Sequence, residues 1–225
     1  MDSPLPAGQV FFDAKRWMET YDALSTNNVE LLWRFAKSCL LYSQQIIDEN
    51  KKEALLLQGR QALQIALELD RDCFEVLKHA ALIASNLANH SKKNEIIEFA
   101  YFKEFADKAL QIEPDDFELL YLRGRYHFMN PNFSWICYIF LFCQTYSFDL
   151  AIEDLLEAEN LRPKQYIEIH YYLALCYIAK NNIGSALEHL QIANQFEPVD
   201  MIHRRMKSEV RDLLIRYLNS DIETR

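Results

Sequence analysis

One spacing of residues constrains the fold of this chain more than any other feature. Three small or apolar residues stand at offsets of zero, four and seven, and in three of four copies a proline follows at offset twelve. The first three positions share one face of a helix, and the proline ends that helix. The copies start 43, 49 and 35 residues apart. Their members are Gly59, Leu63 and Ala66; Phe102, Ala106, Ala109 and Pro114; Ala151, Leu155, Ala158 and Pro163; and Ala186, Leu190, Ala193 and Pro198.

A helical unit that recurs about every 34 residues is typical of helical-hairpin solenoids, in which each hairpin packs on its neighbours. Only four glycines and six prolines occur in 225 residues, too few for the turns of an all-β fold. We therefore predict an all-α fold: a right-handed α-solenoid of about four tetratricopeptide-like hairpins plus a C-terminal capping helix. The expected divisions are an N-terminal extension with a weak helix at 1–28, repeats over 29–200 (29–71, 72–114, 115–163 and 164–198), and the capping helix and tail at 201–225.

The first helices of two hairpins carry a signature of their own. Gly124 falls ten residues after Pro114, where such repeats use a small residue to let their two helices cross closely. In the fourth hairpin, Ala174 and Tyr177 follow the first-helix pattern of tetratricopeptide repeats. We therefore expect Gly124, Ala174 and Tyr177 to pack between helices.

An uncharged run, NPNFSWICYIFLFCQTYS at residues 130–147, interrupts the third hairpin. It is shorter than the stretch of about 20 apolar residues that spans a membrane. Three interpretations stay open: burial within the array, contact with a partner or lipid surface, and an artefact of the gene model such as a retained intron. Burial is the leading interpretation, because long apolar stretches in soluble chains belong to the core.

Composition excludes several classes of protein. A net charge of -9 leaves no general basic surface for nucleic acid or an anionic membrane. Five scattered cysteines without a C-x-x-C pair indicate neither a disulfide framework nor a zinc site. The first twenty residues carry acidic groups and no unbroken apolar core. We therefore expect no secretory signal and no membrane anchor, and a soluble, cytoplasmic chain.

The sequence offers no motif for catalysis. It lacks H-E-x-x-H, a glycine-rich phosphate loop and G-x-S-x-G, and no two histidines stand at ligand spacing. The six histidines are spread over different predicted helices without a convergent partner, which favours a packing or surface role for each. We predict no enzyme activity, no catalytic residue, no cofactor and no metal site.

Function is then expected on surfaces. The first helices of a hairpin solenoid line its concave side, which offers a groove for a partner peptide or helix. Tyrosine and arginine are frequent contact residues on such surfaces. By helical spacing, the candidate groove contacts are Arg34, Ser38, Tyr121, Arg125, Phe128, Tyr171 and Leu175. The alternative is that half of them pack against the terminal helix.

Four segments carry a family resemblance: LLWRFAKSCL near the start, KALQIEPDDFELLYLRGRYHF in the middle, Phe133 to Trp135, and FDLAIEDLLEAENLRP. Together they resemble the regulator of microtubule dynamics family over roughly residues 28–218. The resemblance implies a tetratricopeptide-like scaffold that binds microtubules in the cytoplasm, at the cytoskeleton, the mitotic spindle and the spindle poles, and that acts in chromosome segregation. Some relatives are membrane-anchored, so the alternative is a lipid or apolar-ligand binding protein at organelle contacts. The chain departs from the family just after Trp135.

A basic cluster on the C-terminal helix is a second candidate surface. Because the surface of tubulin is acidic, this cluster is the most direct electrostatic route to a microtubule. Glu209 and Asp212 stand among its charges and neutralise them if they form pairs three or four residues apart. The candidate microtubule-contact patch consists of His203, Arg204, Arg205, Lys207 and Arg211.

Overall fold

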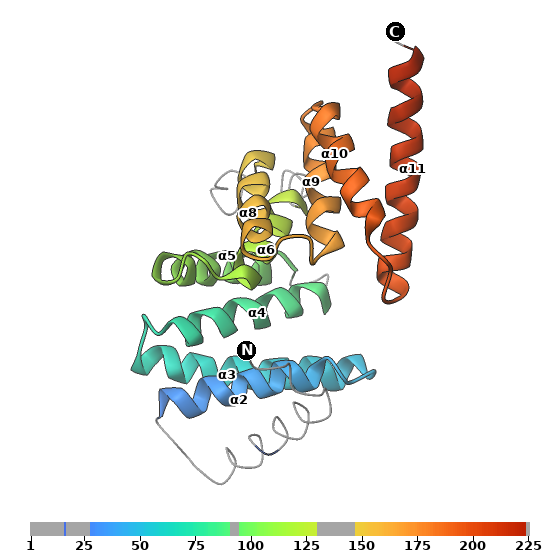
Figure 1. Ribbon diagram of the computed structural model, residues 1–225. Helices are drawn as coiled ribbons and strands as arrows, with labels where there is room; N and C mark the ends of the chain where they lie inside the picture. Colours follow the sequence, from blue (N-terminus) through green and yellow to red (C-terminus); the bar gives the residue numbers. More distant parts are fainter. Residues whose placement is uncertain (1–15, 17–27, 91–94, 130–146, 224–225) are drawn as a thin grey trace. The chain divides into compact units, whose positions relative to one another are not determined.

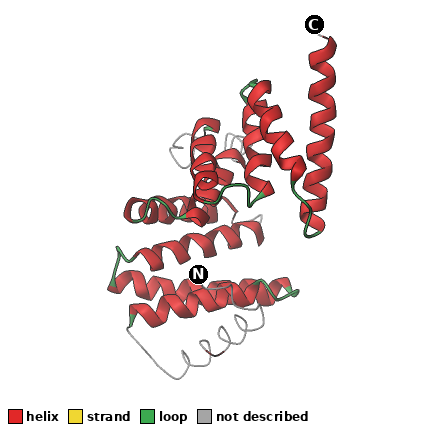
Figure 2. Cartoon of the chain, viewed as in Figure 1, coloured by secondary structure: helices red, strands yellow, loops and turns green. Residues whose placement is uncertain are grey.

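The structure is a computed structural model that describes Arg16 and residues 28–90, 95–129 and 147–223 (Figure 1). All regular elements in these residues are α-helices, and no strand occurs among them (Figure 2). The predicted all-α fold is confirmed. The helices are α2 (Val29–Ser43), α3 (Glu49–Leu69), α4 (Phe74–His90), α5 (Glu95–Ile112), α6 (Phe117–Met129), α8 (Phe148–Leu161), α9 (Ile167–Ala179), α10 (Ile183–Gln195) and α11 (Met201–Glu223).

Two segments that the sequence singles out lie almost wholly outside the described residues. They are the extension at 1–28, with its expected weak helix, and the uncharged run at 130–147. Among the described cysteines, Cys39 and Cys176 are buried free thiols. Burial raises the pKa of both to about 12, so they remain protonated and behave as packing residues.

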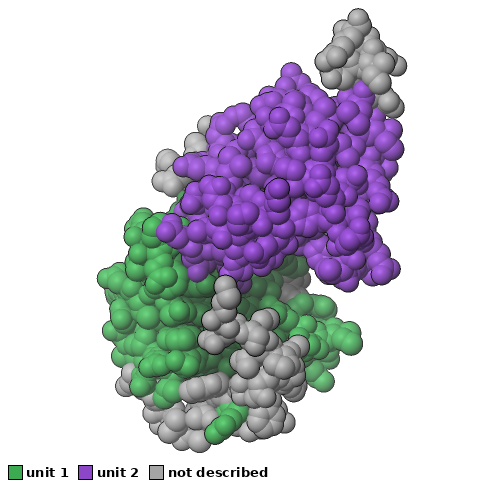
Figure 3. All heavy atoms as spheres, viewed as in Figure 1, with its two compact units in different colours: residues 1–114 green, residues 115–225 purple. Residues whose placement is uncertain are grey.

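The chain forms two compact units, residues 1–114 and 115–225 (Figure 3). In the first unit α2 packs on α3 and α4 packs on α5; in the second, α6 packs on α8 and α9 packs on α10. Within each unit the first helices of the two hairpins also meet, α2 with α4 and α6 with α9. Each unit is therefore a pair of stacked helical hairpins, and the second also contains the terminal helix α11.

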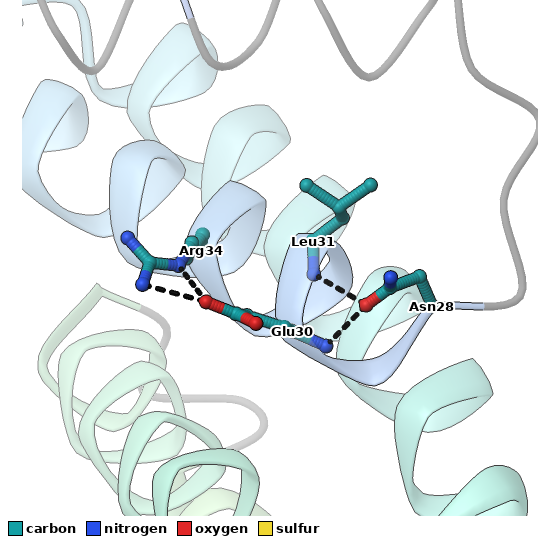
Figure 4. Close-up of polar contacts among 4 residues, drawn as sticks. All are labelled: Asn28, Glu30, Leu31 and Arg34. Atoms are coloured by element: carbon teal, nitrogen blue, oxygen red, sulfur yellow. Dashed lines mark hydrogen bonds and ion pairs between the residues drawn. The ribbon is translucent and has the colours of Figure 1, made fainter.

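Short polar side chains fix where the helices begin. The side-chain oxygen of Asn28 accepts hydrogen bonds from the backbone N–H groups of Glu30 and Leu31 at 2.9 and 3.3 Å (Figure 4). Asp48 and Ser147 cap α3 and α8 in the same way. Because such caps satisfy backbone donors that have no partner inside the helix, they locate the start of each hairpin helix.

The residues at offsets zero, four and seven of the repeated spacing are buried between helices, whereas Pro114 and Pro163 are exposed. On α8 and α10, all three residues of each set expose 0% of their surface. At Gly124, α6 crosses α8 so closely that only a small residue fits. A Cβ at this position would lie 2.7 Å from Leu155 Cγ and 3.3 Å from the Ala151 carbonyl oxygen. At Gly59 of α3, a Cβ would lie 2.7 Å from Ile83 Cδ1. A larger residue would therefore overpack either contact.

The terminal helix covers the fourth hairpin. Met206, Val210 and Leu214 of α11 are buried in a cluster with apolar residues of α9 and α10. Lys207 is also buried, and its ammonium group donates a 2.6 Å hydrogen bond to the Phe196 carbonyl oxygen just beyond α10. Carbonyl groups at the C-terminal end of a helix favour a cation. Both apolar burial and this charge therefore hold α11 in place.

Candidate protein-interaction surfaces

An aromatic face runs along α6 and its neighbour α9 in the second unit. On α6, Phe117, Tyr121, Arg125 and Phe128 stand four, four and three residues apart and so share one side of the helix. The rings of Phe117 and Tyr121 stack with centroids 6.3 Å apart, and the Phe128 ring packs on Tyr172 of α9 at 5.4 Å. We call Tyr121, Arg125, Phe128 and Tyr172 the α6–α9 aromatic face.

Arg125 is the charged centre of this face. Its guanidinium carbon lies 5.5 Å from the centroid of the Tyr121 ring and 5.3 Å from that of Tyr172, within the range of cation–π attraction. Nη1 donates a 3.4 Å hydrogen bond to the Tyr121 hydroxyl, whereas the buried Nε has no hydrogen-bond partner among the described residues. Burial raises the pKa of Tyr121 despite the opposing charge of Arg125. The face therefore presents a cation framed by neutral rings.

The predicted groove contacts of the second unit have two kinds of surroundings. Tyr121, Arg125 and Phe128 lie together on the α6–α9 aromatic face. Tyr171 instead lies against the terminal helix, because its hydroxyl donates a 2.6 Å hydrogen bond to Glu209 Oε2 on α11. Tyr171 is thus one of the residues that pack against the terminal helix, the alternative that the sequence left open.

Tyr172, the residue of α9 that meets Arg125, is not among the residues predicted from sequence. It stands three residues before the predicted contact Leu175, which is half-buried. Residues three apart share one side of a helix, and this spacing is the signal that points to Tyr172. The adjacent Tyr171 obscures that signal, because two successive residues of a helix point in different directions.

In the first unit, the predicted contacts Arg34 and Ser38 lie on α2. Arg34 pairs with Glu30 one turn earlier at 2.7 Å (Figure 4), and its guanidinium carbon lies 4.9 Å from the centroid of the Trp33 ring. The hydroxyl of Ser38, which is buried, donates a 2.9 Å hydrogen bond to the Arg34 carbonyl oxygen. The Arg34 side chain is 40% exposed and can be reached by a partner, whereas Ser38 is engaged within its own helix.

Three members of the predicted basic patch on α11 lie beside carboxylates: His203, Arg205, and Lys207, whose Nζ is 3.7 Å from Glu197 Oε1. His203 Nε2 is 3.0 Å from Glu168 Oε1, and His203 Nδ1 is 2.8 Å from Asp200 Oδ1. Burial disfavours the charged form of His203, but the two carboxylates outweigh burial and raise its pKa. Arg205 pairs with Glu209 at 3.1 Å, the i,i+4 arrangement that the sequence allowed. Part of the patch is therefore neutralised.

Lys207 does not reach the outer surface of α11, because it is buried and bound to the Phe196 carbonyl oxygen. Arg204 and Arg211 are exposed. Arg211 makes a long hydrogen bond of 3.4 Å from Nε to Asn194 Oδ1 of α10. The outward charge of the patch therefore rests chiefly on Arg204 and Arg211.

A continuous stripe of exposed residues contains these two arginines. Arg204, Ser208, Arg211, Ile215 and Leu218 stand four, three, four and three residues apart, which places them on one side of α11. All five are exposed, and Ile215 and Leu218 expose 61% and 44% of their surface. We call these residues the outer stripe of α11. It combines two cations with two aliphatic side chains and contains no acid.

Two histidines that the sequence separates lie in contact inside the fourth hairpin. His170 Nδ1 of α9 is 3.1 Å from His189 Nδ1 of α10, and the Tyr177 ring stacks on His189 at 5.5 Å. Glu159 Oε1 is 3.3 Å from His170 Nε2. Burial lowers the pKa of both histidines, that of His170 to about 4, so both rings are neutral near pH 7. The expectation that no histidine has a convergent partner is wrong, because the hairpin turn at 180–182 brings the two together.

The two surfaces consist of side chains that bind by charge, ring stacking and apolar contact. Across the described residues, no group of three or more His, Cys, Asp or Glu side chains is placed to hold a metal ion. Nor is any helix in that part of the chain long and apolar enough to cross a bilayer. The α6–α9 aromatic face and the outer stripe of α11 offer guanidinium groups, rings and aliphatic side chains, which are favoured at protein interfaces.

Helical hairpins that meet through small residues, with the first helices of neighbouring hairpins in contact, define a tetratricopeptide-like helical-repeat protein. Solved structures of MamA, a helical solenoid of this class, agree with that assignment. One MamA structure matches with a TM-score of 0.54 over 90% of this chain and 92% of MamA, at 16% identity. MamA from Desulfovibrio magneticus RS-1 matches with a TM-score of 0.54 over 83% and 92%, at 12% identity. At such identities the likeness concerns the fold alone, and it confirms the predicted solenoid class.

The chain belongs to the regulator of microtubule dynamics family, as its sequence resemblance implied. The family model described as Regulator of microtubule dynamics protein 1-3 matches residues 10–218. Regulator of microtubule dynamics protein 1 of Caenorhabditis elegans is 29% identical over 170 residues, which cover 73% of this chain and 74% of the relative. Protein 3 of Xenopus laevis is 25% identical over 82% of this chain and 41% of its own length. The chain therefore spans most of the nematode relative but less than half of the frog relative.

Proposed function

We propose that this chain is a non-enzymatic, microtubule-associated scaffold. The family supports a microtubule-related role, because its relatives are named as regulators of microtubule dynamics. The helical-repeat fold supports a binding role, since such repeats present extended surfaces to other proteins. We propose that the outer stripe of α11 is the surface that contacts the microtubule. The supporting observation is that cations and aliphatic side chains are exposed together on this stripe.

The outer stripe of α11 fits an acidic partner. In a chain of net charge -9, most of the surface repels the acidic exterior of a microtubule. Arg204 and Arg211 stand about two turns apart, with no acid between them on the stripe; the exposed Asp212 follows Arg211 but points to a neighbouring side of the helix. Ile215 and Leu218 supply apolar area. The charges then set orientation and association rate, and the aliphatic side chains add contact area.

We further propose that the chain acts on microtubule organisation in the cytoplasm and at the mitotic spindle and its poles, in chromosome segregation. This finer assignment rests on the family resemblance. Live imaging of the tagged chain in dividing cells tests it. A spindle signal that disappears when microtubules are depolymerised supports the assignment, and a uniform signal throughout division contradicts it.

Co-sedimentation with stabilised microtubules tests the contact itself. Arg204→Glu combined with Arg211→Glu reverses both cations of the outer stripe of α11 and leaves the buried Lys207 intact. We expect the apparent Kd of this double variant to rise about tenfold or more at low ionic strength, because two attractive charges become repulsive. Pelleting of the parent chain should weaken as salt is added.

A matched control reverses two charges elsewhere. Lys51→Glu combined with Arg71→Glu changes the net charge equally, at exposed positions of the first unit. We expect this control to pellet like the parent chain. If the Arg204→Glu/Arg211→Glu variant also pellets like the parent, the outer stripe of α11 is not the contact. If the parent chain does not pellet at all, the proposed microtubule association is wrong.

A second candidate function is the binding of a lipid or another apolar ligand at organelle contacts. A cavity of about 110 Å³ in the first unit favours it, with Leu63, Ile83 and Phe105 among its apolar lining residues. An apolar cavity of about 150 Å³ accepts benzene, so this one suits a small apolar group. Native mass spectrometry after gentle purification separates the candidates, because a co-purifying lipid supports this one and its absence favours the microtubule scaffold.

A further inference from the structure

Two arginines show how this fold places a guanidinium group between helices. Arg60 of α3 binds both carboxylate oxygens of Glu98 on α5. Arg123 of α6 binds both oxygens of Asp154 on α8, at 2.8 and 2.7 Å. The two arginine side chains expose only 24% and 22% of their surface. In each case a bidentate carboxylate offsets the cost of taking the guanidinium group out of water.

Arg125 stands on α6 two residues after the second of these arginines and has no such carboxylate among the described residues. Its neighbours are the rings of Tyr121 and Tyr172, and its Nε is buried without a hydrogen-bond partner in that part of the chain. The Glu168 carboxylate is near enough to act on the pKa of Tyr121. Its Oε1 is 3.0 Å from His203 Nε2 and its Oε2 is buried without a hydrogen-bond partner within the described ranges, so it makes no bidentate pair with Arg125. Arg125 therefore retains donors that a carboxylate can use.

The surroundings of Arg125 favour a carboxylate attached to a hydrocarbon stem. The guanidinium group is a planar fork whose donors match two carboxylate oxygens. The rings of Tyr121 and Tyr172 limit the approach of water, and a charge-assisted hydrogen bond is stronger where water is excluded. The Phe128 ring packs on Tyr172 and extends the apolar wall of the site. Methylene groups next to the carboxylate would lie against this wall.

We infer that the α6–α9 aromatic face binds the side-chain carboxylate of an acidic peptide belonging to a partner protein. The inference rests on the proposed scaffold function, but it names a site and a ligand class that are independent of the outer stripe of α11. A wholly apolar ligand fits the face less well, because it would leave the buried Arg125 Nε without a hydrogen-bond acceptor. The free energy lost when this N–H group is removed from water would then not be recovered. Glutamate supplies both the acceptor oxygens and the stem.

Fluorescence anisotropy on the full chain tests the inference. The probe is a fluorescein-labelled peptide of alternating glutamate and glycine, and we expect saturable binding that weakens with salt. Arg125→Gln removes the charge at similar length and should raise the Kd about tenfold or more. Arg125→Lys keeps the charge but loses the planar fork, and should cause a smaller loss.

Two controls keep the result interpretable. A peptide of alternating glutamine and glycine has the same size without the charge, and the parent chain should bind it much more weakly. Circular dichroism melting shows whether each variant is folded, and Arg125→Lys remains informative if Arg125→Gln is not. The inference is overturned if the folded variants bind the glutamate peptide like the parent, if the two peptides bind equally, or if the parent binds neither.

Two further measurements separate this site from its alternatives. The Arg204→Glu/Arg211→Glu variant should bind the glutamate peptide like the parent chain. A parent chain that does not pellet with microtubules therefore does not contradict this inference. A parent chain that does not bind the peptide likewise does not contradict the proposed microtubule contact. Vesicles of phosphatidylcholine with phosphatidylserine test a lipid phosphate at the same place. Vesicle binding that depends on Arg125, without peptide binding, overturns the inference in favour of a lipid headgroup.

Discussion

The third and fourth hairpins share their residue spacing but differ in what fills their interiors. In the third, α6 and α8 cross at Gly124 and are joined by the buried ion pair of Arg123 with Asp154. In the fourth, α9 and α10 pack around alanines and the neutral pair of His170 with His189. The spacing therefore sets how two helices cross, whereas the polar residues inside are free to differ. Those residues should decide how each hairpin responds to mutation and to acid.

The largest expected effect is at the ion pair of the third hairpin. Asp154→Ala leaves the Arg123 guanidinium group without its bidentate carboxylate, and should lower the free energy of unfolding by about 3 to 5 kcal/mol. The two side chains expose only 22% and 7% of their surface, so water compensates little. Urea unfolding followed by circular dichroism measures the loss.

Asp149→Ala on the same helix is the control for that substitution. Asp149 is 74% exposed and pairs with Lys180 at the surface, so its loss should cost at most about 1 kcal/mol. Similar losses for both variants would show that the buried pair of the third hairpin is no stronger than a surface pair. The proposed difference between the interiors of the third and fourth hairpins would then be wrong.

The fourth hairpin should be the one that responds to acid. Burial holds the pKa of His170 at about 4, below its ordinary value of 6.5, and the charge of Lys164 adds to this. Between these values the unfolded chain binds more protons than the folded one, so stability is retained above pH 6.5 and lost as the pH falls toward 4. The expected loss is about 3 kcal/mol.

His170→Gln tests this pH dependence, because glutamine does not titrate. Urea unfolding of the parent and the variant at a series of pH values gives the difference between their free energies of unfolding. That difference should change between pH 6.5 and 4 and be constant above pH 7. The neighbouring groups Glu159 and His189 remain in both proteins. A difference that does not vary with pH would show that folding does not change the pKa of His170.

The smallest effects concern two glycines. Gly124→Ala should lower the free energy of unfolding by about 1 to 3 kcal/mol, because the new Cβ meets Leu155 Cγ at 2.7 Å. Gly184→Ala, in the first turn of α10, should stabilise by up to about 1 kcal/mol, because the nearest atom to its Cβ is Asn182 Oδ1 at 3.9 Å. Thermal unfolding compares the two variants, and stabilisation by both would mean that the crossing of α6 and α8 shifts to accommodate a methyl group.

Much of the fold could be predicted from sequence because its determinants are local. The spacing that includes Ala151 and Leu155 is contained within one helix, and Gly124 stands at a fixed distance from the preceding proline. Side-chain environments were harder to predict. Lys207 is charged and stands beside two arginines, yet its position on α11 points it toward the end of α10. Only the packing of two helices decides whether such a long side chain is exposed or buried.

The candidate site depends on contacts between helices, and these follow no sequence period. Arg125 and Tyr172 meet across the two first helices of the second unit, with the uncharged run and α8 between them in the chain. His170 and His189 meet across a turn. Helical spacing indicated which residues of α6 share a side and that Tyr172 and Leu175 share a side of α9, but it did not show that these two sides face each other.

The buried Lys207 couples the detachment of α11 to the opening of the fourth hairpin. Its bond to the Phe196 carbonyl oxygen joins the residue that follows α10 to α11, and Met206 and Val210 on either side of Lys207 are also buried. Detaching α11 would break the bond and expose the apolar side of the fourth hairpin in the same event. Amide hydrogens of α10 should therefore exchange with solvent at the rate at which the terminal helix opens. Cleavage within α11 would then leave the whole hairpin open to proteases.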